Sequence, residues 1–298
     1  MSTILVAGAT GMVGSEICTM LLAEGRPVRA LVRSTSVPAK VEKLKSLGAE
    51  IVQGDVRDRT SLDKACQGVT HVISTVSAMP FSYEAGVNDL RITDVEGNSS
   101  LIEAAKANGV AQFIFTSIAV DEIPESPLKW ANGEVERKLK ESGLVYTILR
   151  PSFFMEVWLS PAVGFDPANA KATIYGTGQN PISWIAVRDV ARFAVSSLDH
   201  PAAKNATLRL GGPQALTPLE VVKIFEEAGG RTFEQQFMPV EALEAQQAAA
   251  SDAMQQSFFA GMRAYAGGDP IEMAETIQTF AVQPSTVQEY ARRLLTPA

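Results

Sequence analysis

The chain has 298 residues, a formal net charge of −7 at pH 7 and a pI near 5.1. Its hydrophobic content of 46% and charged content of 20% are typical of a globular protein with a large core. The acidic balance argues against a nucleic acid partner, because phosphate binding needs a basic surface. We expect neither a signal peptide nor a membrane-spanning run, and therefore a cytoplasmic protein that binds no membrane.

The most informative segment is a glycine-spaced turn that follows the apolar run 4–7 and precedes an amphipathic helix. Glycine lets the backbone turn sharply and approach a pyrophosphate, and the helix N-terminus supplies free N–H groups. The spacing differs from G-x-G-x-x-G, and an ordinary tight turn is the alternative. The strand and helix on either side favour a dinucleotide site, for which we predict Gly8, Thr10, Gly11, Met12, Val13 and Gly14 as cofactor-binding residues.

The end of the second strand, 28–32, indicates which dinucleotide binds. NAD-preferring sites carry an acidic residue about 20 positions beyond the glycines, where it binds the ribose 2′-hydroxyl. This chain has Arg33 there, followed by Ser34 and Thr35. A guanidinium pairs with a 2′-phosphate, so NADP(H) is the preferred cofactor and NAD(H) the second candidate. A solvated surface arginine is the alternative.

Strands and helices alternate through the first half of the chain, which is typical of a doubly wound parallel sheet. After the first two strands, the predicted strands are 50–55, 71–76, 111–117 and 145–150. The predicted helices between them are 39–47, 60–67, about 92–108 and about 128–142. Cys18 and Cys66 fall on predicted helices and indicate core positions rather than a disulfide framework.

The alternation stops after Pro151. Residues 151–183 suit loops over a site, and about 184–200 form a strand end and a helix that return to the sheet. A short strand at 207–210, a helix from Thr217 and a mobile surface helix around 242–256 complete the pattern. The expected fold is α/β, a Rossmann-type sheet with a smaller C-terminal substrate lobe. The expected domains are 1–150 for NAD(P) and 151–298 for the substrate.

Several motifs resemble those of the atypical short-chain dehydrogenase/reductases, in particular the NmrA-like group of quinone reductases and NADPH sensors. The resemblance covers the whole chain and is strongest through about residue 200. It includes the three glycines and the segments 54–58, 115–117, 134–136, 142–151 and 185–191.

The resemblance implies further cofactor contacts. Asp55 and Val56 would contact the adenine, although Asp55 as a plain turn residue is the alternative. The ribose and nicotinamide would be lined by Ser74, Thr75 and Val76, and the carboxamide would be held by Pro151, Ser152 and Phe153. These positions follow strand ends, where parallel sheets bind ligands.

The usual proton relay of these reductases, Ser with Tyr-x-x-x-Lys, is altered in this chain. Ser117 occupies the Ser position and is the predicted catalytic residue. Aligned through Glu136, the Tyr position holds Leu128 and the Lys position holds Asn132. Neither supplies a proton at neutral pH, although Asn132 can bind the ribose. Lys129 is three residues away on the helix and is expected to be a solvated side chain.

Apolar and aromatic residues follow three successive elements of the predicted sheet. Any one of them suits a core, but together they favour a flat, apolar substrate. The predicted pocket residues are Met79, Phe81, Tyr83, Trp130, Phe154, Met155 and Trp158. No cluster of metal-ligating residues is evident, and a monomer or homodimer is expected.

Two hypotheses follow. The first is an NADPH-dependent oxidoreductase that transfers hydride to a small, apolar, aromatic acceptor such as a quinone or conjugated enone. Such an acceptor takes hydride directly, and positioning provides most of the rate. The second is a non-catalytic NADP(H)-binding redox sensor or scaffold, which the missing Tyr and Lys favour.

Overall fold

The apolar runs of the first half form the centre of a seven-stranded sheet. The computed structural model describes residues 2–79, 82–119 and 121–296. The strand order is β3-β2-β1-β4-β5-β6-β9, and the six strands from β3 to β6 pair in parallel. This arrangement confirms the predicted Rossmann-type sheet. Its strands are β1 (Thr3–Ala7), β2 (Val28–Val32), β3 (Glu50–Gln53), β4 (Val69–Ser74), β5 (Gln112–Thr116), β6 (Val145–Pro151) and β9 (Ala206–Leu210).

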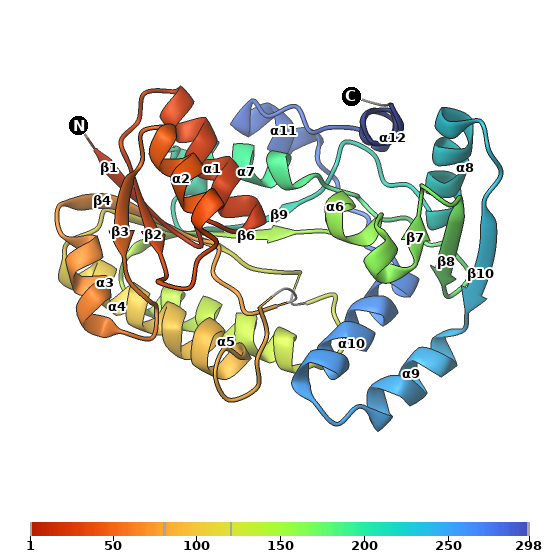
Figure 1. Ribbon diagram of the computed structural model, residues 1–298, viewed down its shortest axis with the longest axis horizontal. Coiled ribbons are helices and arrows are strands. Elements are labelled where there is room, and N and C mark those ends of the chain that lie inside the picture. Colours follow the sequence, from red (N-terminus) through yellow and green to blue (C-terminus); the bar gives the residue numbers. More distant parts are fainter. Residues whose placement is uncertain (1, 80–81, 120, 297–298) are drawn as a thin grey trace. The chain divides into compact units, whose positions relative to one another are not determined.

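Helices cover both faces of this sheet, with α1 and α2 on one face and α3, α4 and α5 on the other (Figure 1). Their bounds are α1 (Met12–Ala23), α2 (Pro38–Ser46), α3 (Arg59–Cys66), α4 (Asn98–Ala107), α5 (Pro127–Glu141) and α7 (Val187–Ser196), with a 3-10 turn at Pro201–Ala203. Because helices cover both faces of the sheet, its central strands need continuous apolar runs. Residues 4–7 form such a run and are fully buried. Leu5, Phe113 and Ile148 pack in one cluster with Leu101 and Leu139 of the helices.

Two compact units make up the chain. The first comprises residues 1–118, 130–150 and 190–208, and the second comprises 119–129, 151–189 and 209–298. Residues 119–129, which connect β5 to α5, thus belong to the second unit. The two domains expected from the sequence, 1–150 and 151–298, stay a prediction.

The second unit contains a three-stranded sheet that the sequence analysis did not predict. Its order is β10-β8-β7, formed by β7 (Phe165–Asp166), β8 (Lys171–Tyr175) and β10 (Glu234–Met238). Trp184, Phe225 and Tyr265 are buried in the core of this unit. Its helices are α6 (Met155–Trp158), α8 (Pro218–Gly229), α9 (Val240–Ala249), α10 (Ala253–Gly267), α11 (Ala274–Phe280) and α12 (Val287–Leu295), with a 3-10 turn at Pro161–Val163.

Two predicted helices differ from the observed ones. The helix expected at 92–108 begins as a π-helix, Leu90–Gly97, and only α4 is α-helical. The single helix expected around 242–256 was wrong, because α9 ends at Ala249 and α10 begins at Ala253. Asp252 caps α10 by accepting from the Gln255 N–H at 2.8 Å, so a helix start interrupts the Ala/Gln-rich run.

Candidate cofactor and active site

The glycine turn between β1 and α1 is too tightly packed for side chains at two of its three glycines. Gly8 has φ +82°, which favours glycine, and a Cβ there would lie 2.5 Å from Thr75 Oγ1. A Cβ on Gly14 would lie 2.2 Å from the Gly8 carbonyl oxygen. Gly8 therefore permits the turn, and Gly14 permits the close approach of helix and strand.

Gly11 differs from its two neighbours because it is exposed and a Cβ there would contact only the Gly8 carbonyl, at 3.1 Å. It is the N-cap of α1, with no side-chain cap and no acidic residue in the first turn. The first helical bond runs from the Ser15 N–H to the Gly11 carbonyl at 3.1 Å, so the N–H groups of residues 12–14 precede the helical ladder. An uncapped helix N-terminus of this kind suits an anion.

Charged side chains gather where β2 and β3 end. Val32 pairs with Gln53 in register, which brings the following residues, Arg33 and Asp55, to the same edge of the sheet. Arg33 is exposed, and Asp55 is held by Arg57 at 2.6 and 2.9 Å. The hydrogen bond from Arg57, with a smaller contribution from Arg33, lowers the pKa of the Asp55 carboxyl below its usual range. The Thr10 carbonyl of the glycine turn accepts from Lys40 at 3.2 Å.

The segment that follows β4 rests on buried polar side chains from the π-helix and α4. Ser74 has no exposed surface and donates to Asn98 Oδ1 at 2.6 Å. The Asn98 amide donates in turn to the Val76 carbonyl at 3.3 Å. Asp94 Oδ2 accepts from the Ala78 N–H at 2.8 Å. The side chains of Asn98 and Asp94 therefore hold the backbone that follows β4, which includes the predicted nicotinamide contact Val76.

Asp94 is a buried carboxyl, 4% exposed. Burial raises the pKa of Asp94 from 3.8 to about 7, against the opposing effects of the Ala78 N–H and the Ser77 hydroxyl. The nearby charge of Asp89 also raises the pKa of Asp94, so ionising Asp94 at neutral pH costs free energy.

Ser117, the predicted catalytic residue, belongs to a buried network at the end of β5. Its hydroxyl donates to Glu136 Oε1 at 2.7 Å and lies 3.4 Å from Asn132 Oδ1. Arg150 donates to both oxygens of Glu136, at 2.8 and 2.6 Å. Glu136 is 3% exposed, so Arg150 supplies the charge that a buried carboxylate requires. The Ser117 proton is thus directed to Glu136.

The start of α5 shows what surrounds Leu128, the residue at the predicted Tyr position. The Leu128 N–H donates to the Ser257 hydroxyl of α10 at 3.1 Å. Lys129 forms an ion pair with Glu125 at 2.7 Å and is 25% exposed, so it is a paired rather than a solvated side chain.

The predicted pocket residues of the first unit differ in exposure. Trp130 is 49% exposed, whereas Met79 and Tyr83 are half-buried. Phe81 lies outside the described residues. Val56, a predicted adenine contact, is 6% exposed and packs against Gly97 of the π-helix.

The remaining predicted residues, 151–155 and Trp158, lie in the second unit, at the end of β6 and just after it. Phe153 and Trp158 meet edge to face at 4.8 Å, and both rings pack against Tyr265, at 6.0 and 5.6 Å. Met155 has no exposed surface and lies in the core, whereas Phe154 is half-buried. Pro151 is buried, and among the described residues the buried Ser152 hydroxyl has no hydrogen-bond partner.

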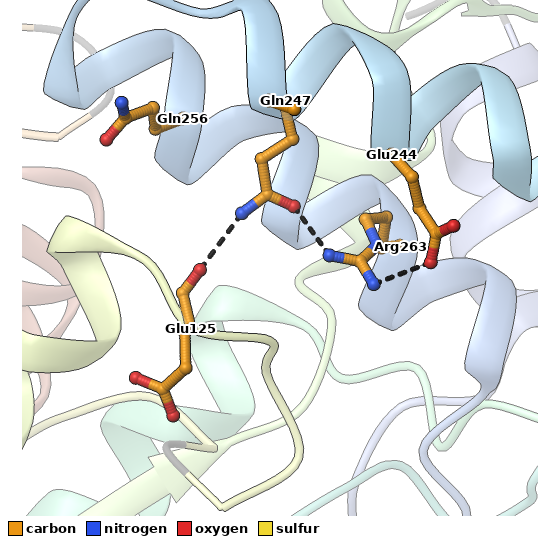
Figure 2. Close-up of a pocket in the computed structure, with 6 residues that line it drawn as sticks. Glu125, Glu244, Gln247, Gln256 and Arg263 are labelled. Carbon is orange, nitrogen blue, oxygen red and sulfur yellow. Dashed lines mark hydrogen bonds and ion pairs between the residues drawn. The ribbon is translucent and has the colours of Figure 1, made fainter.

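The second unit also has a cavity of about 230 Å³ beside α9 and α10, lined mainly by polar and charged residues. Figure 2 shows Gln247 between the Glu125 carbonyl and Arg263, with bonds of 2.9 and 2.8 Å. Arg263 also pairs with Glu244 at 2.7 Å. These bonds tie the connection before α5 to α9, and α9 to α10. None of the residues that line the cavity is a predicted residue of the apolar pocket.

Sequence reasoning did not identify Arg57, Asp94, Asn98 or Arg150 as parts of this site. Arg57 had a local signal, because it follows Asp55 by two residues. The other three contact partners far along the chain, and no spacing rule finds such pairs. Within the described ranges, no group of three or more His, Cys, Asp or Glu residues could hold a metal ion. No helix of that part of the chain could cross a membrane.

The parallel sheet, the glycine turn and the uncapped helix behind it define a dinucleotide-binding protein of Rossmann type. The NmrA-like family model matches residues 1–291, and the chain belongs to this family. The resemblance noted from the motifs is thereby confirmed.

Two curated relatives and one solved structure illustrate the likeness. The chain is 32% identical over 281 residues to the NAD(P)H azoreductase of Xenophilus azovorans, covering 93% of this chain and 91% of that protein. It is 31% identical to the photosystem II assembly factor Ycf39 of Trieres chinensis, covering 77% and 70%. The fold is similar to that of the NADPH-dependent quinone oxidoreductase QOR2 of Escherichia coli, solved with NADPH, at 24% identity, TM-score 0.77, and coverage of 98% and 100%.

Proposed function

We propose that this protein is an NADPH-dependent reductase that transfers hydride to a small apolar acceptor such as a quinone or a conjugated enone. The observation that carries the proposal is the open turn at Gly11 in front of an uncapped helix N-terminus. The azoreductase relative, which the chain matches over nearly its whole length, supports a reductase. Because one fold hosts several functions, the function of this chain has to be inferred from the residues of its site.

Residues of the first unit suit the phosphate end of the cofactor, and one residue of the second unit, taken by itself, suits its carboxamide. At the phosphate end, the N–H groups of residues 12–14 at the uncapped start of α1 suit a pyrophosphate, and the exposed Arg33 suits a 2′-phosphate. At the nicotinamide end, Ser152 carries a buried hydroxyl to which no described residue is hydrogen-bonded. Buried polar atoms are normally hydrogen-bonded, so this orphaned hydroxyl suits the carboxamide that the family resemblance assigns to it.

The cofactor supplies the hydride, and the chain supplies positioning. Because the Ser117 hydroxyl donates to Glu136, its lone pairs are left to accept hydrogen bonds. Leu128 and Asn132 offer no acidic proton at neutral pH. An acceptor whose reduced anion is stable needs no protein acid, because water can protonate it. We therefore infer that Ser117 does not protonate the acceptor and contributes instead by holding Glu136 in place.

We expect NADPH oxidation, followed by absorbance at 340 nm, to depend on an added quinone. Ser117→Ala should lower kcat by about tenfold at most, since a general acid contributes ~10²–10⁴-fold and Ser117 is not one. Ser142→Ala, which alters a serine bonded to Leu139, is the matched control. Failure of every quinone, enone and azo acceptor to be reduced, despite measurable NADPH binding, would contradict the enzyme proposal.

Arg33→Ala should weaken NADPH binding by about 1.5–3 kcal/mol while leaving NADH binding nearly unchanged, because only NADPH has the 2′-phosphate. Fluorescence titration with both cofactors measures the difference. Arg91→Ala removes an exposed arginine of the π-helix and serves as control. Equal losses for NADPH and NADH would refute the assignment of Arg33.

The second candidate is a non-catalytic NADP(H)-binding sensor or scaffold. The similarity to an assembly factor and the altered proton relay favour it. A partner protein that binds the NADPH and NADP⁺ forms with different affinity would support this role. Equal affinity for both forms would end it. The cytoplasmic location, the apolar substrate and the monomeric or homodimeric state stay predictions.

A further inference from the structure

Arg57 encloses the carboxylate of Asp55. Its Nε donates to Oδ1 at 2.9 Å and its Nη2 to Oδ2 at 2.6 Å. The Arg57 backbone N–H also donates to Oδ1, at 2.9 Å. Nη1 is directed elsewhere, to the Val87 carbonyl at 2.8 Å. A planar guanidinium matched to both oxygens of a carboxylate is the strongest form of such a pair.

Asp55 lies close enough to Arg33 for the charge of Arg33 to lower the pKa of the Asp55 carboxyl. In the part of the chain that the structure describes, however, the Arg33 guanidinium forms no ion pair. The Asp55 carboxylate already has two side-chain bonds from Arg57, which reduces its attraction for a second guanidinium. Two cations and one anion therefore share this edge of the sheet.

We propose that Arg57 determines cofactor specificity by neutralising Asp55, which leaves Arg33 available for the 2′-phosphate of NADPH. The proposal rests on the cofactor site of the proposed function. Without Arg57, the Asp55 carboxylate would compete for Arg33 and would repel the phosphate. Removal of Arg57 thus changes the selectivity between the cofactors and not simply the affinity for both.

The test measures dissociation constants for NADPH and NADH by fluorescence titration. Arg57→Ala is expected to lower the NADPH preference about tenfold or more, which corresponds to about 1.4 kcal/mol. Arg57→Gln keeps a donor for the Val87 carbonyl but loses the charge, so it should lower the NADPH preference by the same amount. This variant decides the outcome if the alanine variant does not fold. Adding Asp55→Asn to Arg57→Ala should restore much of the NADPH preference, because the repelling charge is gone.

Arg59→Ala is the matched control, because it removes the same charge two residues away. Arg59 pairs with Asp63 and Glu103, at 2.9 and 2.8 Å, and not with Asp55. It should leave the preference within about twofold, since exposed charges are screened. If the NADPH preference is unchanged in both Arg57 variants, or if Arg59→Ala changes it as much as they do, this inference is overturned while the proposed function stands. A wild-type protein that binds neither cofactor overturns the proposed function and this inference with it.

Discussion

Replacing Gly11 with leucine should abolish measurable NADPH binding while the protein stays folded. The Gly11 backbone, with φ −78° and ψ 176°, is extended and open to any residue. A leucine side chain would occupy the space in front of the helix N-terminus and exclude the pyrophosphate. Loss of charge-assisted bonds to the phosphates, at ~1.5–3 kcal/mol each, predicts at least a hundredfold weaker binding.

The matched variant is Gly14→Ala, which should instead destabilise the fold, because its Cβ would lie 2.2 Å from the Gly8 carbonyl oxygen. Chemical denaturation measures the free energy of unfolding, and titration measures NADPH binding. Gly11→Leu should change the first by roughly 1 kcal/mol or less, the usual range for an exposed site. A Gly11→Leu protein that binds NADPH as the wild type does would show that this turn is not a phosphate site.

Asp94→Asn should make the protein more stable at pH 8 and remove part of the pH dependence of its stability. The pKa of Asp94 is about 7 in the folded state and near 3.8 in the unfolded state, so the folded state binds the proton more tightly. The free energy of unfolding of the wild type therefore falls as pH rises from about 4 to about 7 and then stays level, a loss of up to about 4 kcal/mol. Asparagine keeps an oxygen for the Ala78 N–H without a buried charge.

Denaturation of both proteins from pH 4 to pH 9 tests this expectation. The two curves should agree near pH 4, where Asp94 is protonated, and separate by about 2–4 kcal/mol above pH 7. Asp63→Asn changes an exposed carboxylate of α3, 44% exposed, and should give a curve parallel to that of the wild type. An Asp94→Asn protein less stable than the wild type at pH 8 would mean that the ionised carboxylate stabilises the fold.

The sequence predicted the Rossmann-type sheet and its cofactor turn because both depend on local patterns. Runs such as residues 4–7 are apolar on both faces, so they identify buried parallel strands without knowledge of their partners. Glycines between a strand and a helix report a backbone requirement that only glycine meets, as at Gly8. The same local reading missed β10, whose residues are exposed except for the last and therefore carry no hydrophobic period.

What the tertiary structure decided is which charged and polar side chains meet. Glu136 and Arg150 lie on α5 and β6, and Asp94 lies sixteen positions from Ala78, the residue whose N–H it binds. Burial sets the pKa of Asp94, and burial depends on every element packed around it. The sequence alone therefore predicted a dinucleotide-binding turn and a preference for NADPH. Only the folded chain showed that Ser117 donates to Glu136 and that Arg57 holds Asp55. These contacts depend on how the side chains are brought together in space, which local sequence patterns do not specify.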